Sequence, residues 1–336
     1  MGVMYAIHTL LPHYSYIHIP TPFSSYFIFS ISDCIENLLC IRHVFYDFAI
    51  LCYRGVFIMN IKRLLIIGGD LRIAHLAQSL RSDGYVAESF KGAEPLKNAV
   101  DRCDAVILGL PATKDDKTVD APELAQPILI KDLFKIMGRG KLLLAGRMSD
   151  GMKAVADVFS VRWADYFNRD EFELLNAIPT CEGALQAAME ELPVTIHSCN
   201  AIVTGYGRIG RLLAHDLSAL GANVTVAARK TSARALAKTD NVKAVDFTKL
   251  CDEARKADVI FNTVPSRVIG RDVVFAARNA LIIDLASKPG GVDMEAAKDA
   301  GTRVIWALGL PGKVAPVTAG NIIKETIYNI FSELGE

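Results

Sequence analysis

The sequence predicts an α/β protein with two parallel-sheet domains in tandem and a cleft between them. From Lys62 onward, short runs rich in Val, Ile and Leu alternate with stretches that have helical spacing of apolar residues. Most of the short runs end in glycine, proline or polar residues, which is typical of the carboxyl edge of a parallel sheet. The 336 residues, of which 51% are hydrophobic, suffice for two domains.

The first unit contains three predicted strands and one early helix. The strands are residues 64–67, 105–108 and 141–145, and the helix is 72–82. Ligands of open parallel sheets bind outside the carboxyl ends of the strands. Arg72 and Arg147 follow two of these ends, so we expect them to contact an anionic substrate, with an ordinary surface role as the alternative. The long polar loop 112–126 is either a functional lid or a mobile surface loop.

The second unit begins with the most specific motif of the chain. An apolar run, 201–204, leads into Gly205-Tyr206-Gly207-Arg208-Ile209-Gly210, and a stretch with helical spacing follows. In this strand–turn–helix context, G-x-G-x-x-G is typical of dinucleotide binding, because its glycines permit the turn, the approach of the pyrophosphate and close helix packing. The N–H groups at the helix start then face the phosphates. We therefore predict Rossmann-like, doubly wound domains and cofactor contacts from all six residues; an ordinary strand-to-helix turn is the alternative.

The end of the next predicted strand, 223–227, selects the cofactor. It leads into Ala228-Arg229-Lys230-Thr231-Ser232 without an acidic residue. An acid near this point usually holds the ribose of NAD, whereas an arginine suits the 2′-phosphate of NADP. The Arg229 guanidinium can hold a phosphate with two hydrogen bonds, and Lys230 adds a charge. The sequence thus predicts NADP, bound in part by Arg229, Lys230 and Thr231; a solvated basic turn is the alternative.

Two further strand ends face the same crevice. Residues 259–261 and 281–283 are apolar runs that end in polar or proline-containing loops. We predict ribose or nicotinamide contacts from five residues of these loops: Asn262, Thr263, Val264, Pro265 and Ala286. Lys288 is a further candidate for binding a carboxylate. The alternative is that the prolines only end the strands.

Residues 168–191 are mostly helical and should join the two domains. Glu182 lies in this linking segment, where it can orient a substrate or move a proton. Capping or salt-bridging a helix is the alternative role for Glu182. The amphipathic segment 319–334, with Thr318 as its N-cap, should pack back on the first domain.

We accordingly divide the chain into an atypical extension (1–58), a substrate and catalytic domain (59–180), an NADP-binding domain (181–317) and a C-terminal helix (318–336). The extension has no lysine, and none of its residues before Asp33 is an acid, a lysine or an arginine. It lacks the basic region of a secretory signal, and prolines interrupt any membrane span. We interpret it as upstream sequence translated from a start codon assigned too early, with an interfacial anchor as the alternative.

Charge and cysteine content exclude several classes of protein. The 37 basic and 37 acidic side chains give a formal net charge of zero, so we expect neither nucleic acid nor a membrane as a partner. The seven cysteines show no metal-binding spacing, which favours reduced thiols in a cytoplasmic protein without a metal. No G-x-S-x-G, H-E-x-x-H or Walker A lysine occurs, so hydrolases and NTPases are excluded.

Taken in order, six blocks of the sequence resemble the family formed by the A subunits of dipicolinate synthase. They are Gly68-Gly69-Asp70, residues 176–184, the glycine motif, and residues 262–265, 284–291 and 307–316. The resemblance covers about residues 59–336 and leaves the extension outside; Cys181 departs from it, since a small residue such as alanine is expected there. It implies NADP-dependent oxidation of dihydrodipicolinate, from 4-hydroxy-tetrahydrodipicolinate, to dipicolinate during sporulation. It also implies the B subunit of dipicolinate synthase as a partner, and we expect an oligomer.

Under this hypothesis the protein needs only to place a ring carbon near the nicotinamide and to hold two carboxylates, because forming an aromatic ring favours hydride loss. Arg72, Arg147 and Lys288 are the candidates for holding the carboxylates, and Glu182 is the candidate for handling the proton. Two alternatives remain open. One is another NADP-dependent dehydrogenase of shikimate-dehydrogenase-like build, whose catalytic Lys and Asp pair has no counterpart in this sequence. The other is a cofactor-binding regulatory subunit.

Overall fold

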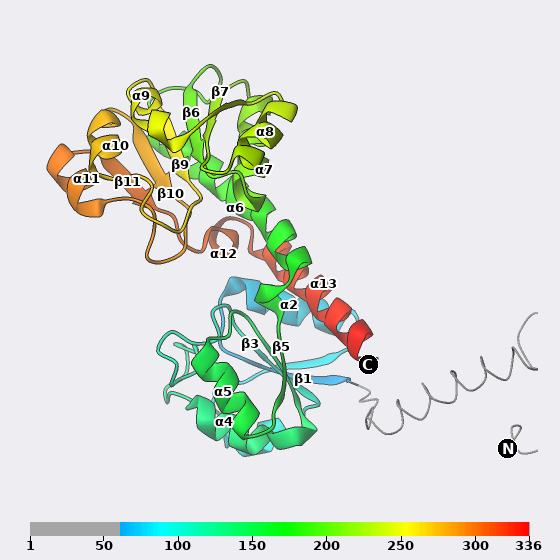
Figure 1. The fold of residues 1–336 in the computed structure, drawn as a ribbon. Helices are drawn as coiled ribbons and strands as arrows, with labels where there is room; N and C mark the ends of the chain where they lie inside the picture. The colour runs from blue at the N-terminus through cyan, green and yellow to red at the C-terminus, as the bar shows by residue number, and fades with distance from the viewer. Residues whose placement is uncertain (1–60, 336) are drawn as a thin grey trace, which may run out of the picture. The chain divides into compact units, whose positions relative to one another are not determined.

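The computed structural model describes residues 61–335, so the predicted extension 1–58 lies outside the described residues. The described chain forms two parallel β-sheets flanked by helices (Figure 1). The first sheet has the strand order β2-β1-β3-β4-β5 and the second β11-β10-β9-β6-β7-β8. We call the first sheet with its helices the first lobe, and the second sheet with its helices the second lobe. The predicted fold class, two Rossmann-like parallel-sheet domains in tandem, is confirmed.

The first lobe is formed around strands that are buried on both faces. Its strands are β1 (Arg63–Ile67), β2 (Val86–Ser89), β3 (Ala105–Leu108), β4 (Leu142–Ala145) and β5 (Arg162–Asp165). Its helices are α2 (Leu71–Ser82), α3 (Leu96–Asp101), α4 (Ile130–Met137) and α5 (Asp150–Val158), with the short 3-10 helices η1 (Gly138–Gly140) and η2 (Tyr166–Asn168). Every residue of β3 and β4 is buried, as expected for the central strands of a parallel sheet covered by helices.

The second lobe repeats this architecture with one more strand. Its strands are β6 (Asn200–Thr204), β7 (Asn223–Ala227), β8 (Lys243–Val245), β9 (Val259–Asn262), β10 (Leu281–Asp284) and β11 (Arg303–Trp306). Its helices are α7 (Arg208–Ala219), α8 (Thr231–Thr239), α9 (Leu250–Ala254), α10 (Arg271–Ala276) and α11 (Met294–Ala300), with η3 (Phe247–Lys249). The strand order reverses between β6 and β9, and ligands of doubly wound sheets bind at such a point.

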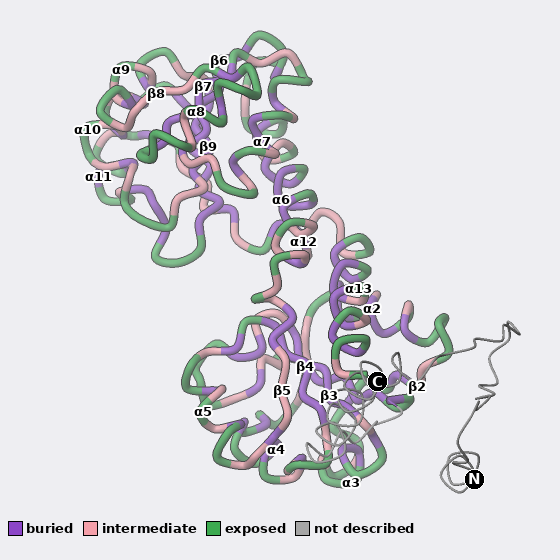
Figure 2. The backbone as a smooth tube through the Cα atoms, turned by 45° about the vertical axis from the view of Figure 1, so that its right-hand side comes forward, coloured by how far each residue is buried: buried purple, intermediate pink, exposed green. Residues whose placement is uncertain are grey.

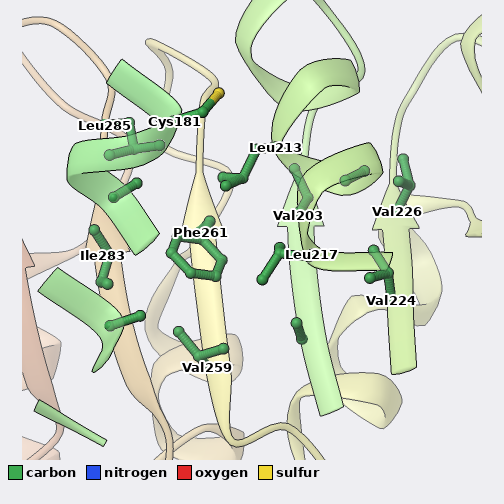
Figure 3. Close-up of a cluster of buried hydrophobic side chains, with 14 of the residues drawn as sticks. Cys181, Val203, Leu213, Leu217, Val224, Val226, Val259, Phe261, Ile283 and Leu285 are labelled. Carbon is green, nitrogen blue, oxygen red and sulfur yellow. The ribbon is translucent and has the colours of Figure 1, made fainter. Parts of the chain in front are cut away.

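Apolar side chains from neighbouring strands form the core of the second lobe. Val203, Phe261 and Ile283 come from three adjacent strands and are fully buried against Leu213 of α7 (Figure 3). The interior strands of the described chain are buried almost throughout, while the outer faces of the helices are exposed (Figure 2). This burial pattern fixes the strand ends, and therefore the loops that follow them.

Three helices complete the described chain: α6 (Asp170–Glu191), α12 (Leu310–Val314) and α13 (Pro316–Leu334). α13 packs against α2 of the first lobe. The Tyr85 and Tyr328 rings stack with centroids 5.9 Å apart, and Lys324 Nζ and the Tyr328 hydroxyl each donate to Asp83 at 2.7 Å. None of the described helices is long and apolar enough to cross a lipid bilayer.

The prediction that Thr318 caps the last helix is wrong. α13 begins two residues earlier, at Pro316, and no side chain caps it. Proline suits the first helical position because the N–H that it lacks would have no partner there.

Candidate functional site

A cavity of about 1520 Å³ lies among the carboxyl ends of strands from both sheets. It exceeds the roughly 300–1,000 Å³ of a typical small-ligand pocket, so it has room for a dinucleotide together with a second ligand. Nine of the predicted site residues line it: Arg72, Arg147, Gly207, Arg208, Ile209, Thr263, Pro265, Ala286 and Lys288. Nine others do not: Glu182, Gly205, Tyr206, Gly210, Arg229, Lys230, Thr231, Asn262 and Val264.

The three glycines of the motif have different roles in the turn between β6 and α7. Gly205 has φ +89°, and a Cβ there would lie 2.6 Å from Thr263 Oγ1. A Cβ on Gly210 would lie 2.4 Å from the Gly205 carbonyl oxygen. By contrast, a Cβ on Gly207 would meet no atom within 4 Å. Gly205 and Gly210 are therefore needed for the fold of the turn, whereas Gly207 borders open space in the cavity.

The start of α7 suits a bound phosphate. Gly207 is the N-cap residue, and no side chain caps the helix. The first N–H groups of a helix have no partner within it, and they bind anions. Together with the open space at Gly207, this geometry fits the pyrophosphate of a dinucleotide.

Asn262 holds the strand ends of the second lobe together. Its side chain is fully buried; Oδ1 accepts from Thr204 Oγ1 at 2.6 Å and from Val264 N at 3.1 Å. Nδ2 donates to Asp284 Oδ1 at 2.7 Å and to the Val264 carbonyl at 3.0 Å. An amide side chain has four such positions, and all are used. The Asn262 side chain is thus unavailable for the predicted contact with ribose or nicotinamide, and it positions the loops that line the cavity.

The turn after β7 presents two exposed cations. Arg229 and Lys230 are exposed, and no described residue pairs with either side chain. Arg234 holds the turn in place, because its Nη1 donates to the Ala228 and Arg229 carbonyls at 2.7 Å each and to Asp246 at 2.7 Å. Thr231 Oγ1 accepts from Arg234 Nη2 at 3.3 Å. The turn therefore has a fixed backbone and two free positive charges.

Tyr206 points to the end of α8. Its hydroxyl donates to Asp240 at 2.7 Å, and Arg211 Nε donates to the same carboxylate at 2.9 Å. Burial and the neighbouring Asp240 raise the pKa of Tyr206 to about 12. Its hydroxyl is therefore a committed hydrogen-bond donor, and it does not line the cavity.

One face of α6 borders the cavity, and Glu182 is not on it. The lining residues of α6 are Phe172, Glu173, Asn176, Ala177 and Thr180, with the spacing of a single helix face. Glu182 follows Thr180 by two residues, about 200° around the helix, and it is exposed. The role predicted for Glu182 therefore has no geometric support. Burial raises the pKa of the neighbouring Cys181 thiol to about 12, which leaves it unreactive.

Arg72 is buried in a pair with Asp70 at the start of α2. Arg72 Nη2 donates to Asp70 Oδ2 at 2.7 Å and to the Leu110 carbonyl at 2.8 Å, and Nε also donates to Asp70. Burial opposes ionisation of Asp70, but the hydrogen bonds and charge of Arg72 outweigh it and lower the pKa of Asp70. A Cβ on Gly312 would lie 2.8 Å from Arg72 Nε, so α12 closes tightly over this pair. Arg72 thus borders the cavity with much of its charge already balanced.

Three other cations on the cavity wall have no ionic partner among the described residues: Arg147, Lys288 and Lys313. Arg147 has φ +59°, and its N–H donates to Asp165 Oδ1 at 2.9 Å. Its guanidinium lies 5.9 Å from the centre of the Phe167 ring. We did not predict Lys313 as a site residue; the only signal for it in the sequence is its place in the block 307–316. These three cations suit a ligand with more than one negative charge.

Comparison with known proteins agrees with this geometry. Residues 63–167 match the family model of the N-terminal domain of the dipicolinate synthase A subunit, and residues 180–282 match that of the NAD binding domain of D-isomer specific 2-hydroxyacid dehydrogenases. The dipicolinate synthase A subunit of Bacillus subtilis (strain 168) is 30% identical over 290 residues, which cover 81% of this chain and 96% of the relative.

Solved structures show the same relationship. The crystal structure of the dipicolinate synthase A subunit from Bacillus halodurans has a TM-score of 0.73 and 28% identity, and the match covers 81% of this chain and 98% of that one. The A chain of dipicolinate synthase from Bacillus subtilis has a TM-score of 0.72 and 27% identity, with 81% and 96% covered.

The fold and the site therefore define an oxidoreductase of the dehydrogenase class that binds a nicotinamide dinucleotide. Within that class, the chain belongs to the family of dipicolinate synthase A subunits. The resemblance predicted from the six ordered blocks is confirmed.

Proposed function

We propose that this protein oxidises a dihydrodipicolinate to dipicolinate with NADP, as the substrate-oxidising component of a sporulation enzyme. The observation that carries the proposal is the cavity itself, where three unpaired cations face the same space as an open dinucleotide turn. A pyridine ring with two carboxylates matches that charge pattern. The family membership supports the same substrate class and a partner, the B subunit of dipicolinate synthase.

The second lobe supplies the groups that would hold NADP. Gly207 and Arg208 lie where the pyrophosphate would bind, and Arg229 and Lys230 would bind the 2′-phosphate. The absence of an acid at the end of β7 favours NADP over NAD. When bound, the cofactor supplies the hydride acceptor. Thr263, Pro265 and Ala286 border the cavity beyond the glycine turn and would position the redox ring.

The first lobe and its neighbours supply the groups that would hold the substrate. Arg147 comes from the turn after β4, Lys288 from the loop after β10 and Lys313 from α12. Each carboxylate can accept a charge-assisted hydrogen bond from at least one of them. Arg72, held by Asp70, forms the wall beside them. Residues 59–180 would thus contribute Arg147 to the substrate, and residues 181–317 would hold the cofactor and contribute Lys288 and Lys313 to the substrate. Residues 318–336 would form a supporting helix.

The test is turnover by the purified chain supplied with enzymatically generated dihydrodipicolinate. We expect dipicolinate and NADPH in equal amounts, and a higher kcat/KM with NADP than with NAD. Product that forms only when the B subunit is added would instead support a regulatory role for this chain. Absence of product both with and without the B subunit would contradict the proposal.

A further inference from the structure

Four carboxylates line the cavity in the described part of the chain: Asp70, Asp116, Asp120 and Glu173. Three of them are paired with cations. Asp70 pairs with Arg72 at 2.7 Å, Asp120 with Lys114 at 2.8 Å, and Glu173 with Arg208. The fourth, Asp116, is exposed to the cavity, and no described side chain or N–H contacts its carboxylate.

No histidine, cysteine or tyrosine lines the cavity among residues 61–335. These side chains, the carboxylates and lysine are the groups that usually accept protons in enzymes. Of the lysines that line the cavity, Lys114 pairs with Asp120, and Lys288 and Lys313 are the cations proposed above to hold the carboxylates. Among the described lining residues, Asp116 is therefore the acidic side chain that is free to accept a proton from a ligand.

The loop between β3 and α4 holds Asp116 in place. The preceding residue, Asp115, accepts hydrogen bonds from Lys117 N at 2.9 Å, Thr118 N at 2.8 Å and Thr118 Oγ1 at 2.9 Å. The Asp116 N–H donates to Thr113 Oγ1 at 3.1 Å. Hydrogen bonds from the Thr118 and Lys117 backbones lower the pKa of Asp115 to about 2. Asp115 is thus a permanent anion that shapes the loop, and Asp116 is the residue presented to the cavity.

Asp116 and Arg147 share an unusual backbone conformation. Five described non-glycine residues have positive φ, and the two that line the cavity are Asp116 at 60° and Arg147 at 59°. This conformation costs roughly 1–2 kcal/mol and persists where the surrounding structure holds it, often at functional sites. The two residues follow neighbouring strands, β3 and β4. The cavity therefore presents one constrained anion and one constrained cation from adjacent turns.

The Asp116 carboxylate lies next to the turn that carries Arg147. Asp116 Oδ2 and Ser149 Oγ each lie 3.9 Å from the position of a Cβ on Gly151, at the start of α5. Asp116 and the turn that carries Arg147 therefore border the same part of the cavity wall.

We propose that Asp116 accepts the proton that leaves the substrate ring when that ring becomes aromatic. The proposal rests on the function proposed above. A dihydropyridine with two adjacent saturated carbons loses a hydride from one of them, with oxidised NADP as the two-electron acceptor. The C–H bond of the other carbon breaks, its electron pair becomes the new ring double bond, and its proton forms an O–H bond with the Asp116 carboxylate. The ring is oxidised by two electrons, and the proton later passes to water.

The competing explanation is that Asp116 only stabilises the start of α5, because an anion near a helix N-terminus is favourable. Both elements that meet at Asp116 carry charged groups: Lys114, Asp115, Lys117 and Asp120 on its own loop, and Arg147, Asp150 and Lys153 beside or on α5. Of these, Asp150 offers a matched control. It lies at the same helix start, is fully exposed and does not line the cavity.

The experiment compares the full chain with D116N and D150N. Calorimetric titration of the NADP-loaded protein with dipicolinate, at pH 7 in two buffers of different ionisation enthalpy, counts the protons bound with the product. We expect net proton uptake with dipicolinate for the wild type and for D150N, and a smaller uptake for D116N. We also expect kcat to fall roughly 10²- to 10⁴-fold in D116N alone, with NADPH affinity changed by less than about twofold.

Each outcome decides the matter. Retention of both proton uptake and turnover in D116N overturns the proposal. Loss of turnover with proton uptake retained and a lowered unfolding temperature also overturns it, in favour of the role at α5. If D116N does not fold, D116E takes its place, and the proposal requires D116E to keep the proton uptake while turning over more slowly. A wild-type protein that neither binds dipicolinate nor forms it contradicts the proposed function itself.

Discussion

In the first lobe, a side chain from the turn after β1 caps the N-terminus of α2, whereas in the second lobe no side chain from the turn after β6 caps the N-terminus of α7. The Asp70 carboxylate caps α2 by accepting from Arg72 N at 3.0 Å. At the equivalent place in the second lobe stands Gly207, which has no side chain and borders the cavity. A helix N-terminus stabilises a nearby anion. The first lobe provides that anion itself, and the second lobe leaves the place to a ligand.

This difference explains how two similar supersecondary units serve two tasks. Where the chain supplies the anion, the turn becomes a rigid wall with a buried arginine. Where the chain does not supply the anion, the turn stays open to a phosphate. Changes that exchange these properties therefore test the comparison directly.

The largest expected effect is from filling the open turn with the G207D variant. The backbone of Gly207 has φ −89°, which any residue adopts, so the variant should fold with an unchanged unfolding temperature. Its carboxylate would occupy the phosphate site as Asp70 does in the first lobe. We expect the Kd for NADPH to rise more than roughly 100-fold, about 2.7 kcal/mol, as measured by fluorescence titration.

The matched control is G205A, in the same turn. Gly205 has φ +89° and no space for a Cβ, so this variant should lose about 2 kcal/mol of stability. If G207D lowered stability as much as G205A does, the open position at Gly207 would have a structural role and the comparison would fail.

The next largest effect is expected from replacing Arg147, the cation without an ionic partner that the first lobe presents to the cavity. We expect R147G and R147A to weaken dipicolinate binding by roughly 30-fold, because both lose a charge-assisted hydrogen bond. The two variants should differ in stability by about 1 kcal/mol in favour of R147G, since glycine tolerates φ +59° without strain. Calorimetry and chemical denaturation measure the two effects separately. Equal dipicolinate affinity in the wild type and both variants would remove Arg147 from the site.

A smaller effect is expected in D70N, which opens the filled turn of the first lobe. Arg72 would remain buried without its partner, and because 46% of the Asp70 side chain is exposed, we expect a loss of only about 1.5 kcal/mol in the free energy of unfolding. The pKa of Asp70 in the folded protein lies below its ordinary value of 3.8. The stabilisation is therefore complete above that value and disappears as the pH falls through the lowered pKa. Denaturation curves should show the deficit of D70N at pH 7 and its decline below pH 3.8; a deficit independent of pH would exclude the ion pair as its cause.

The smallest effect is expected in the double variant R229A/K230A. It should raise the Kd for NADPH only about tenfold, or 1.4 kcal/mol, because the two cations are exposed and screened by salt. The Kd for NADH should stay unchanged, because NADH has no 2′-phosphate. Replacing Lys238, an exposed lysine at the other end of α8, with alanine is the control. A similar loss for NADH would show that the turn does not read the 2′-phosphate.

The sequence was sufficient to predict the central strands but not the strands at the sheet edges. All seven predicted strands correspond to interior strands of the two sheets, while β2, β5, β8 and β11 were missed. Interior parallel strands are buried on both faces and form continuous apolar runs. Each missed strand has at most one buried residue, as in Val86–Ser89 and Lys243–Val245. Their apolar signal is therefore too weak to distinguish them from loops.

The site was predictable where a local motif determines it and unpredictable where it depends on contacts between distant residues. The glycine turn and the cations Arg147 and Lys288 follow from strand ends that are visible in the sequence. Glu182 was misplaced because its direction depends on the rotation of α6 relative to the cavity. Asp116, which we propose as the proton acceptor, was not predicted, because its availability depends on which neighbouring carboxylates already have partners, and only the folded chain shows that.

The packing of α13 on α2 also concerns how the protein acquires its structure. Asp83, at the end of α2, binds Lys324, which follows it by 241 residues. The hydrophobic layer of the first lobe is thus completed by a segment translated after the entire second lobe. A fragment ending before α13 would expose the apolar surface of α2 to water, which makes the N-terminal half dependent on the remainder of the polypeptide for its maturation.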